Sequence, residues 1–364
     1  MIPIAKPSLT GLEKRYLNEA LASTWISSSG EFLDRFETEF ASSVAGTDHA
    51  LAVTNGTVAL HLALAALGVG PGDEVIVPSL TYVATANAVR YLGASPVFAD
   101  VTSDSWCIDP QAIASLITSR TVGVIAVHLY GHSADMDAIN AVARAAGLWV
   151  VEDAAEAPFA TYKGRPTGGL GDIATFSFYG NKVLTSGEGG AVTTNSADLA
   201  DRMRLLRGQG MDPKRRYFFP VVGYNFRMTN LSAALLVAQL ERSVEILAAR
   251  HHVYEQYRQA LSGVPGLRFQ PRKEWAQLSP WLFCVLIDAS VRQDLVSSMN
   301  ADGIETRPFF IPIHTLPPHA GSGRGPMAVT ERLADEGINL PTYPDMSDED
   351  VALVAGSLIA ALVR

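Results

Sequence analysis

Short apolar runs alternate with helical patterns along the first half of the chain, and this alternation limits the folds open to it. Strands are expected at residues 50–54, 74–78, 95–100, 122–128 and 148–151, with helices at 58–67 and 136–146 among them. Strands that alternate with helices in this way form units whose sheet is largely parallel. The sequence therefore predicts an α/β domain.

Composition narrows the class of protein further. The chain has 364 residues, of which 48% are hydrophobic, so it can bury a large core, and its length indicates two domains. The net charge of −9 predicts no basic patch for nucleic acid or for an anionic membrane. Proteins that bind either of them are therefore excluded.

The two cysteines and the apolar runs indicate in which cellular compartment the protein is expected. Cys107 and Cys284 are too few and too far apart to indicate a disulfide framework or a metal site. The sequence shows no secretory signal and no apolar run of the roughly 20 residues that a membrane helix needs. We expect a cytoplasmic protein without a metal ion.

One lysine, Lys182, stands in otherwise uncharged surroundings between Asp172 and Glu188. Hydroxyl-bearing and apolar residues alternate from 174 to 179, which predicts a strand that ends at Gly180, just before the lysine. A lysine shielded from water has a lowered pKa, and its neutral amine can form a Schiff base with an aldehyde. The ordinary alternative is a solvated lysine at the end of a strand.

Two further segments lie at predicted strand ends. Three carboxylates, Glu152, Asp153 and Glu156, follow the apolar run 148–151, at the end of a strand where ligands bind in this architecture. Taken alone, they could be an acid–base pair or metal ligands, although no histidine lies near them in the sequence. Gly56 and Thr57 turn a strand into a helix whose free N–H groups suit a phosphate. The alternative is a plain helix cap by Thr54, Asn55 or Thr57.

The lysine segment resembles a known motif. Ser-Phe-Tyr-Gly-Asn-Lys at 177–182, followed by Thr-Ser-Gly-Glu-Gly-Gly at 185–190, is similar to the lysine motif of the DegT/DnrJ/EryC1/StrS family of sugar aminotransferases, which use pyridoxal 5′-phosphate. The resemblance implies that Lys182 is the catalytic residue and carries the cofactor. It also implies an aspartate-aminotransferase-like fold of type I, with a large mainly parallel domain and a smaller C-terminal α+β domain. We place these domains at residues 1–245, which include the N-terminal segment, and 246–364.

The same resemblance implies the other cofactor contacts. Tyr82 would cover the pyridine ring, and Asp153 would hold the ring nitrogen protonated. Glu156 stands where many relatives carry glutamine, near the phenolic oxygen or the incoming sugar. Asn225 would reach the cofactor phosphate of the other subunit, so a homodimer with shared active sites is implied. The remaining cofactor contacts are expected from Gly56, Thr57 and Ser177.

A loop at residues 207–220, rich in arginine and aromatic residues, bears on the substrate. It resembles the loop of family members that aminate GDP-4-keto-6-deoxymannose at C4, and it could equally be a solvated crossing between elements. The family's amino donor is typically glutamate. The residues expected to contact the nucleotide sugar are Trp25, Ser27, Arg215, Tyr217, Arg227 and His314.

Several other functions remain open. An aminotransferase acting on a dTDP- or UDP-linked keto sugar would carry the same cofactor residues. A dehydratase of the same fold would carry histidine at the lysine position, so Lys182 disfavours it. A silent PLP-binding regulator would need a DNA-binding element. A nicotinamide oxidoreductase would need a glycine-rich loop after the first strand, which is missing because the glycines at 68–72 close a helix instead.

Overall fold

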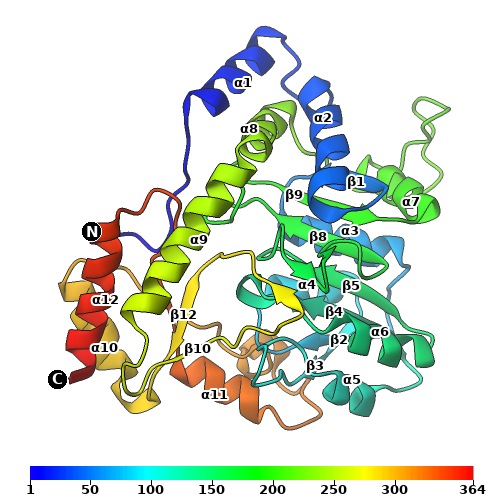
Figure 1. Ribbon diagram of the computed structural model, residues 1–364. Coiled ribbons are helices and arrows are strands. Elements are labelled where there is room, and N and C mark those ends of the chain that lie inside the picture. Colours follow the sequence, from blue (N-terminus) through cyan, green and yellow to red (C-terminus); the bar gives the residue numbers. More distant parts are fainter. Residues whose placement is uncertain (364) are drawn as a thin grey trace.

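The computed structural model describes residues 1–363, and a seven-stranded sheet forms its centre (Figure 1). The strands run in the order β1 (His49–Val53), β9 (Gly190–Thr194), β8 (Ile173–Ser177), β5 (Trp149–Asp153), β4 (Thr121–Val127), β2 (Glu74–Pro78) and β3 (Ser95–Ala99). The five strands from β8 to β3 are parallel neighbours, and β9 is antiparallel to both β8 and β1. The predicted mainly parallel α/β sheet is confirmed.

Helices cover both faces of this sheet, because the side chains of each strand point alternately to either side. On β4, Ile125 packs in one apolar cluster, whereas Val124 and Ala126 pack in another. The first face is covered by α3 (Gly56–Ala66), α4 (Ala84–Tyr91) and α7 (Ala197–Arg207). The second face is covered by α5 (Pro110–Leu116), α6 (Met136–Ala145), α2 (Glu31–Phe40) and α8 (Asn230–Glu241).

An aromatic cluster fixes α2 on the sheet next to the lysine segment. The rings of Phe36 and Phe40 lie edge-on to Phe178, with ring centres 5.5 and 5.3 Å away. Phe40 also meets Phe176 of β8 edge-on at 4.9 Å. Edge-to-face pairs of this kind add to the stabilisation that burial alone provides. The end of β8 is therefore held rigidly on its apolar side, while its other side is free to face a ligand.

A smaller antiparallel sheet lies in the C-terminal part of the chain, beyond the long helix α9 (Ser243–Ala260) (Figure 1). Its strands are β10 (Arg268–Phe269), β12 (Phe283–Leu286), β14 (Gly337–Leu340) and β13 (Arg307–Pro308), accompanied by α10 (Ala289–Ala301), α11 (Ala328–Glu336) and α12 (Asp348–Val363). This is the expected α+β part. The short strand β13 pairs with β14 only over Arg307–Pro308. The domain boundary after residue 245 stays a prediction.

Two connections tie the C-terminal part to segments far away in the sequence. The N-terminal segment, assigned by prediction to the large domain, bonds to the C-terminal part: Ile2 donates to Gly303 O at 2.8 Å, and Thr342 donates to Ile4 O at 2.9 Å. A three-stranded sheet joins β11 (Ala276–Gln277) to β6 (Thr161–Tyr162), which in turn pairs with β7 (Arg165–Pro166).

Among residues 1–363, no helix is long and apolar enough to cross a membrane.

Candidate active site

A cavity of about 480 Å³ lies where the parallel strands end, facing the C-terminal part. Its walls come from the segments after β1, β2 and β5, from the lysine segment after β8, and from residues around β12, β13 and β14. It brings together seven of the predicted site residues: Gly56, Thr57, Tyr82, Asp153, Glu156, Ser177 and Lys182. Segments that are far apart in the sequence, from Asn55 to Asn339, thus meet in one site.

Lys182 is placed by a tight turn after β8. The chain passes through Gly180, and the backbone N–H of Lys182 donates to Tyr179 O at 2.9 Å. The side chain is only 12% exposed, and its Nζ lies 4.0 Å from Oε1 of Glu156. Burial lowers the pKa of the Lys182 amine, against the opposing pull of the carboxylates of Glu156 and Asp153. The neutral, nucleophilic form of the amine is therefore more accessible than in a solvated lysine.

Asp153 is the last residue of β5 and turns its carboxylate into the cavity. Its Oδ2 accepts a 2.7 Å hydrogen bond from the hydroxyl of Thr85, and its Oδ1 accepts one of 3.2 Å from the N–H of Ala155. Burial raises the pKa of Asp153, while these two donors and Lys182 act in the opposite direction. A buried carboxylate of this kind gains most from a cationic partner, and a protonated ring nitrogen is such a partner.

Glu156 lies between the lysine and a strained stretch of backbone. Its Oε2 accepts a 2.7 Å hydrogen bond from the N–H of Tyr130, whose φ of 54° places it in the left-handed region. Burial raises the pKa of Glu156 to about 7, with the charge of Lys182 acting against the shift. The side chain is thus able to change protonation state at neutral pH, close to the amine of Lys182.

Glu152 points away from the cavity, because neighbouring residues on a strand face opposite sides. It is fully buried and accepts hydrogen bonds from the N–H groups of Gly168, Leu170 and Gly171. The Nε2 of His128 lies 2.9 Å from its Oε2. Glu152 therefore organises a loop beneath the sheet. Within the described part of the chain, no group of three or more His, Cys, Asp or Glu side chains is arranged to hold a metal ion.

The start of α3 forms the floor of the cavity. Asn55 caps the helix by accepting from the N–H of Val58 at 3.0 Å, so the capping role belongs to Asn55. Gly56 and Thr57 line the cavity beside Ser177. A Cβ at Gly56 would come within 2.8 Å of the Ser177 Cβ, so this close approach of helix and strand requires glycine. The positive end of the helix dipole and the Ser177 hydroxyl suit a phosphate group.

Tyr82 stands at the mouth of the cavity, on the segment between β2 and α4. Its side chain is 59% exposed, and its ring centre lies 6.0 Å from that of Phe310, which comes from the C-terminal part. An exposed aromatic ring at a cavity mouth can stack on a flat ligand. This position agrees with the predicted contact to the cofactor ring.

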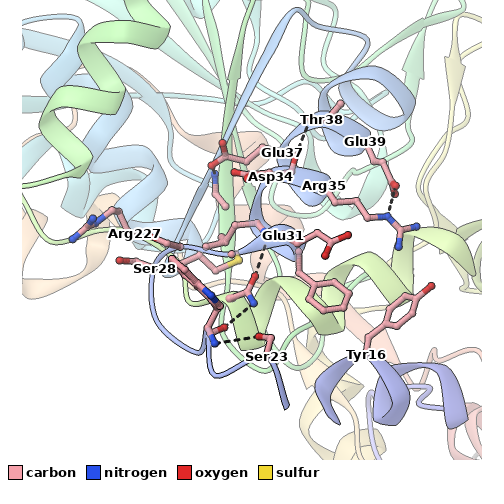
Figure 2. Close-up of a pocket in the computed structure, with 18 of the residues that line it drawn as sticks. Tyr16, Ser23, Ser28, Glu31, Asp34, Arg35, Glu37, Thr38, Glu39 and Arg227 are labelled. Carbon is pink, nitrogen blue, oxygen red and sulfur yellow. Dashed lines mark hydrogen bonds and ion pairs between the residues drawn. The ribbon is translucent and has the colours of Figure 1, made fainter. Parts of the chain in front are cut away.

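The residues expected to contact substrate do not share this cavity. Trp25 and Arg227 line a second and larger hollow of about 1090 Å³, which Figure 2 shows between α1 (Gly11–Ala22), α2 and the segment before α8. Ser27 lies at its edge, where its carbonyl accepts the N–H of Asn230 at 2.6 Å. Acidic side chains dominate this hollow: Glu19, Glu31, Asp34, Glu37 and Glu39.

Four further predicted residues, Arg215, Tyr217, Asn225 and His314, lie outside both the Lys182 cavity and the second hollow. Arg215 and Tyr217 belong to an exposed loop, where Arg215 lies 4.4 Å from the ring centre of Phe218. Asn225 is exposed and outside the cavity of its own chain. The His314 Nδ1 lies 2.7 Å from Ser79 Oγ, and its side chain borders a separate shallow hollow with Glu331. None of these residues touches the Lys182 cavity within one chain.

Several residues that line the Lys182 cavity were not predicted from the sequence. Thr85 and Tyr130 contact the two carboxylates, and the ring centre of Trp281 lies 3.9 Å from Nζ of Lys182. Arg307 and Asn339 complete the wall from the C-terminal part. Nothing in the sequence pattern connects Trp281 with the lysine.

The geometry defines a class of enzyme. A buried lysine whose pKa is lowered, a buried carboxylate, a helix N-terminus with a neighbouring hydroxyl and an exposed aromatic ring line one cavity. These groups fit the aldehyde, ring nitrogen, phosphate and ring of pyridoxal 5′-phosphate. Together with the mainly parallel sheet, they define a pyridoxal-phosphate enzyme of the aspartate-aminotransferase fold. The chain belongs to the DegT/DnrJ/EryC1/StrS aminotransferase family, whose model matches residues 7–359.

Individual relatives span the whole chain. It is 48% identical to a GDP-perosamine synthase of Caulobacter vibrioides, in a match covering 100% of this chain and 98% of that protein. It is 44% identical to a GDP-perosamine synthase of Escherichia coli O157:H7, covering 98% and 97%. Among solved structures, the aminotransferase TlmJ from Streptoalloteichus hindustanus superposes with a TM-score of 0.95 at 33% identity, covering 100% and 99%. The protein is thus a PLP-dependent aminotransferase.

Proposed function

We propose that the enzyme transfers an amino group from glutamate to C4 of GDP-4-keto-6-deoxymannose and so forms GDP-perosamine. One observation carries this proposal: three proteins named GDP-perosamine synthase, from three bacteria, are 42–48% identical to this chain over 96–100% of its length. The match includes the exposed 207–220 loop, which is the segment expected to distinguish substrates. The proposal places the enzyme in deoxyamino sugar biosynthesis, such as that of an O-antigen.

The cavity residues have separate tasks in this reaction. When bound, pyridoxal phosphate accepts the amino group and stabilises the carbanion that forms next to it. Lys182 first holds the cofactor and, once its Nζ is free, takes up and returns the proton of the exchange. Asp153 keeps the ring nitrogen protonated, and Gly56, Thr57 and Ser177 hold the phosphate. Glu156 lies close enough to Lys182 Nζ, at 4.0 Å, to influence where that proton rests.

A second candidate substrate is a dTDP-linked keto sugar. The structure of DesI, described as being in the presence of its TDP-sugar product, superposes with a TM-score of 0.93 at 34% identity over 100% of this chain and 93% of DesI. Since this identity is lower than that to the GDP-perosamine synthases, the GDP sugar is favoured. A sugar dehydratase is disfavoured because a lysine occupies position 182.

The substrate assignment is tested by competition. Enzyme loaded with pyridoxamine phosphate is supplied with equal amounts of GDP-, dTDP- and UDP-linked 4-keto-6-deoxy sugars, and each amino sugar is followed by mass spectrometry. We expect the GDP sugar to react fastest. Faster amination of the dTDP or UDP sugar would overturn the substrate and leave the aminotransferase class intact. Supplying the other common amino acids in place of glutamate tests the donor in the same assay.

The enzyme is further proposed to work as a homodimer with shared active sites. Asn225 is exposed beside a loop whose apolar side chains face solvent in the single chain, with Val222 91% and Tyr217 73% exposed. Exposed apolar side chains gathered in one segment are typical of a surface that a partner covers. We assign Asn225 and this loop to the active site of the second subunit, where Arg215 and Tyr217 would reach the nucleotide sugar.

Mixed dimers test the shared site. A Lys182→Ala chain and an Asn225→Ala chain, each inactive alone, are mixed after reversible dissociation, and one of the two sites in each mixed dimer then has both intact residues. We expect up to about a quarter of wild-type activity, because half of the dimers are mixed and each has one complete site. A fully active monomer in analytical ultracentrifugation would contradict the proposal.

The cytoplasmic location stays a prediction, in keeping with Cys107 and Cys284, which are buried and unpaired.

A further inference from the structure

Trp281, in the C-terminal part of the chain, contacts the lysine segment directly. Its side chain is almost fully buried, and its indole N–H donates a 2.7 Å hydrogen bond to the carbonyl of Asn181. The face of its ring lies 3.9 Å, centre to atom, from Nζ of Lys182. A single side chain thus contacts both the backbone before the lysine and the reactive amine itself.

A buried arginine completes this attachment. Arg250 of α9 donates to the carbonyls of Trp281 at 3.1 Å and of Lys182 at 3.3 Å. It also donates to the carbonyls of Pro280 and Thr342, and no carboxylate is described as its partner. Two successive carbonyls of the lysine segment, those of Asn181 and Lys182, are therefore held from the C-terminal part. The position of the Trp281 ring relative to the amine is fixed by the same bonds.

The amine of Lys182 is enclosed by unlike groups. The Trp281 ring lies on one side at 3.9 Å, and the Glu156 carboxylate lies at 4.0 Å. An ammonium over the face of an indole is attracted by the negative face of the ring, and the attraction is stronger when water is excluded. Burial lowers the pKa of this amine, and the carboxylates of Glu156 and Asp153 act in the opposite direction. The position of the ring over Nζ adds a further attraction for the protonated form.

We propose that Trp281 is a positioning residue that receives the Lys182 amine whenever it is not bound to the cofactor and stabilises its protonated form. The ring attracts the ammonium without adding a fixed negative charge of its own, so the proton is kept on Nζ yet remains available for return to the reacting carbon. A second carboxylate at this position would hold the proton more firmly. Nothing covalent is required of Trp281 itself.

Other charged and titratable groups surround the amine, and they remain constant in the test. Glu156 and Asp153 act on it directly, and Arg250 bonds to its backbone carbonyl. The further titratable groups that line the cavity are Tyr82, Tyr130, Tyr179, Glu188 and Arg307. Because fluorination of an indole weakens the negative face of the ring while nearly preserving its size, it changes the proposed contact and leaves these groups in place.

The experiment measures the protonation of Lys182 directly. Full-length enzyme loaded with pyridoxamine phosphate, in which Lys182 is not engaged by the cofactor, is pulse-labelled with acetic anhydride across a range of pH. Peptide mass spectrometry then gives the rate at Lys182. In protein containing mono-, di- and trifluorotryptophan, we expect the midpoint of labelling to move to lower pH with each fluorine. Below the wild-type midpoint, the fully fluorinated protein should be labelled about three- to tenfold faster.

The chain offers matched controls, since it contains five tryptophans. Fluorotryptophan in a Trp281→Phe protein labels the other four and should leave the midpoint unchanged. Trp275→Phe, which replaces a tryptophan packed on Tyr162 away from the lysine, should retain the fluorine effect. A midpoint that is independent of fluorination in the wild-type protein would overturn the proposal. A change in the plateau rate without a change in midpoint would show that the ring only shields the amine, and would overturn it as well.

This inference rests on the proposed role of Lys182, and the two can fail separately. If Lys182 were not the cofactor lysine, Lys182→Ala would retain turnover and borohydride would not fix the cofactor on it. The labelling midpoint, by contrast, reports only on the amine and the ring, and requires no turnover. A fluorine-independent midpoint in an enzyme that loses activity on Lys182→Ala would refute the role of Trp281 alone.

Discussion

The buried hydroxyl of Thr85 donates a 2.7 Å hydrogen bond to Oδ2 of Asp153, from a helix that begins only one residue earlier. Thr85→Val keeps the shape of the side chain and removes this donor. Because the bond favours the charged carboxylate, its loss should raise the pKa of Asp153 further. The acid limb of the pH–rate profile should then move to higher pH, and kcat below that limb should fall about tenfold.

Thr175→Val is the matched control for this change. The hydroxyl of Thr175 is also buried, on the strand beside Asp153, but it donates to the backbone carbonyl of Glu152 at 3.1 Å. It should cost a similar amount of stability and leave the acid limb where it is. If both variants shifted the limb equally, the effect would come from general loosening of the sheet.

Asp153→Asn is expected to retain the cofactor and lower kcat by several powers of ten. The proposed phosphate contacts from Gly56, Thr57 and Ser177 would be unchanged, whereas the ring nitrogen would lose its proposed charged partner. Cofactor content, measured by absorbance after alkaline release, should stay near one per chain while single-turnover rates fall. Wild-type turnover in this variant would show that Asp153 is not the ring-nitrogen partner.

Lys182→Ala should abolish turnover and leave the fold intact, because its side chain faces the cavity and contributes little to the core. Lys163→Ala is the control, since Lys163 is exposed and pairs with Asp137 on the surface at 2.8 Å. Both variants should unfold within a few degrees of the wild type. Retention of a tenth of wild-type transamination by Lys182→Ala would rule out its catalytic role.

Stability of the cofactor-free protein should depend on pH through Glu156. Its pKa is raised from 4.5 to about 7 in the folded state, so the stability present below pH 4.5 is lost as pH rises through 7. Glu156→Gln removes this loss and still accepts the Tyr130 N–H. Denaturant titrations should show the variant gaining up to about 3 kcal/mol over wild type between pH 5 and pH 8. The exposed Glu349→Gln should show no such trend. A gain independent of pH would contradict the assignment.

Arg250→Met should lower the free energy of unfolding by about 3 kcal/mol, because it leaves buried carbonyls without donors. Arg250 is only 2% exposed, and this burial lowers its pKa to about 10. Arg258→Met, two turns further along α9 and partly exposed, should cost less than about 1 kcal/mol. Equal losses from both variants, measured by denaturant titration, would show that the carbonyl contacts of Arg250 contribute nothing.

The sequence was sufficient wherever a site residue follows directly from a strand end. The family resemblance gave the roles of Asp153, Ser177 and Lys182. The parallel sheet explains why they meet, because Asp153 and Ser177 end neighbouring parallel strands and Lys182 follows shortly after the second. The order of the strands and the inserted antiparallel β9 did not follow, because pairing depends on packing between distant segments. The same reason hid Trp281, which meets Lys182 only after the C-terminal part docks.

Tyr130 and the presumed substrate residues show two other limits. The backbone of Tyr130 is left-handed, and its N–H donates to Glu156. The sequence does not predict this conformation, because glycine and asparagine adopt it most often and tyrosine rarely does. Trp25, Arg227 and His314 were predicted from the family resemblance. Within one chain, they line other hollows and lie outside the Lys182 cavity. Their contact with the nucleotide sugar stays a prediction.

The attachment of the N-terminal segment to the C-terminal part constrains how the protein is made. Ile4 donates to the carboxylate of Glu305 at 2.9 Å, across 301 positions of sequence. At a synthesis rate of about 5–20 residues per second, the partner emerges on the order of 15 to 60 seconds after Ile4 does. The central sheet is complete in the nascent chain once β9 has left the ribosome, so it can form before Ile4 meets Glu305. The segment around Ile4 is therefore synthesised before the sheet but reaches its native place after it.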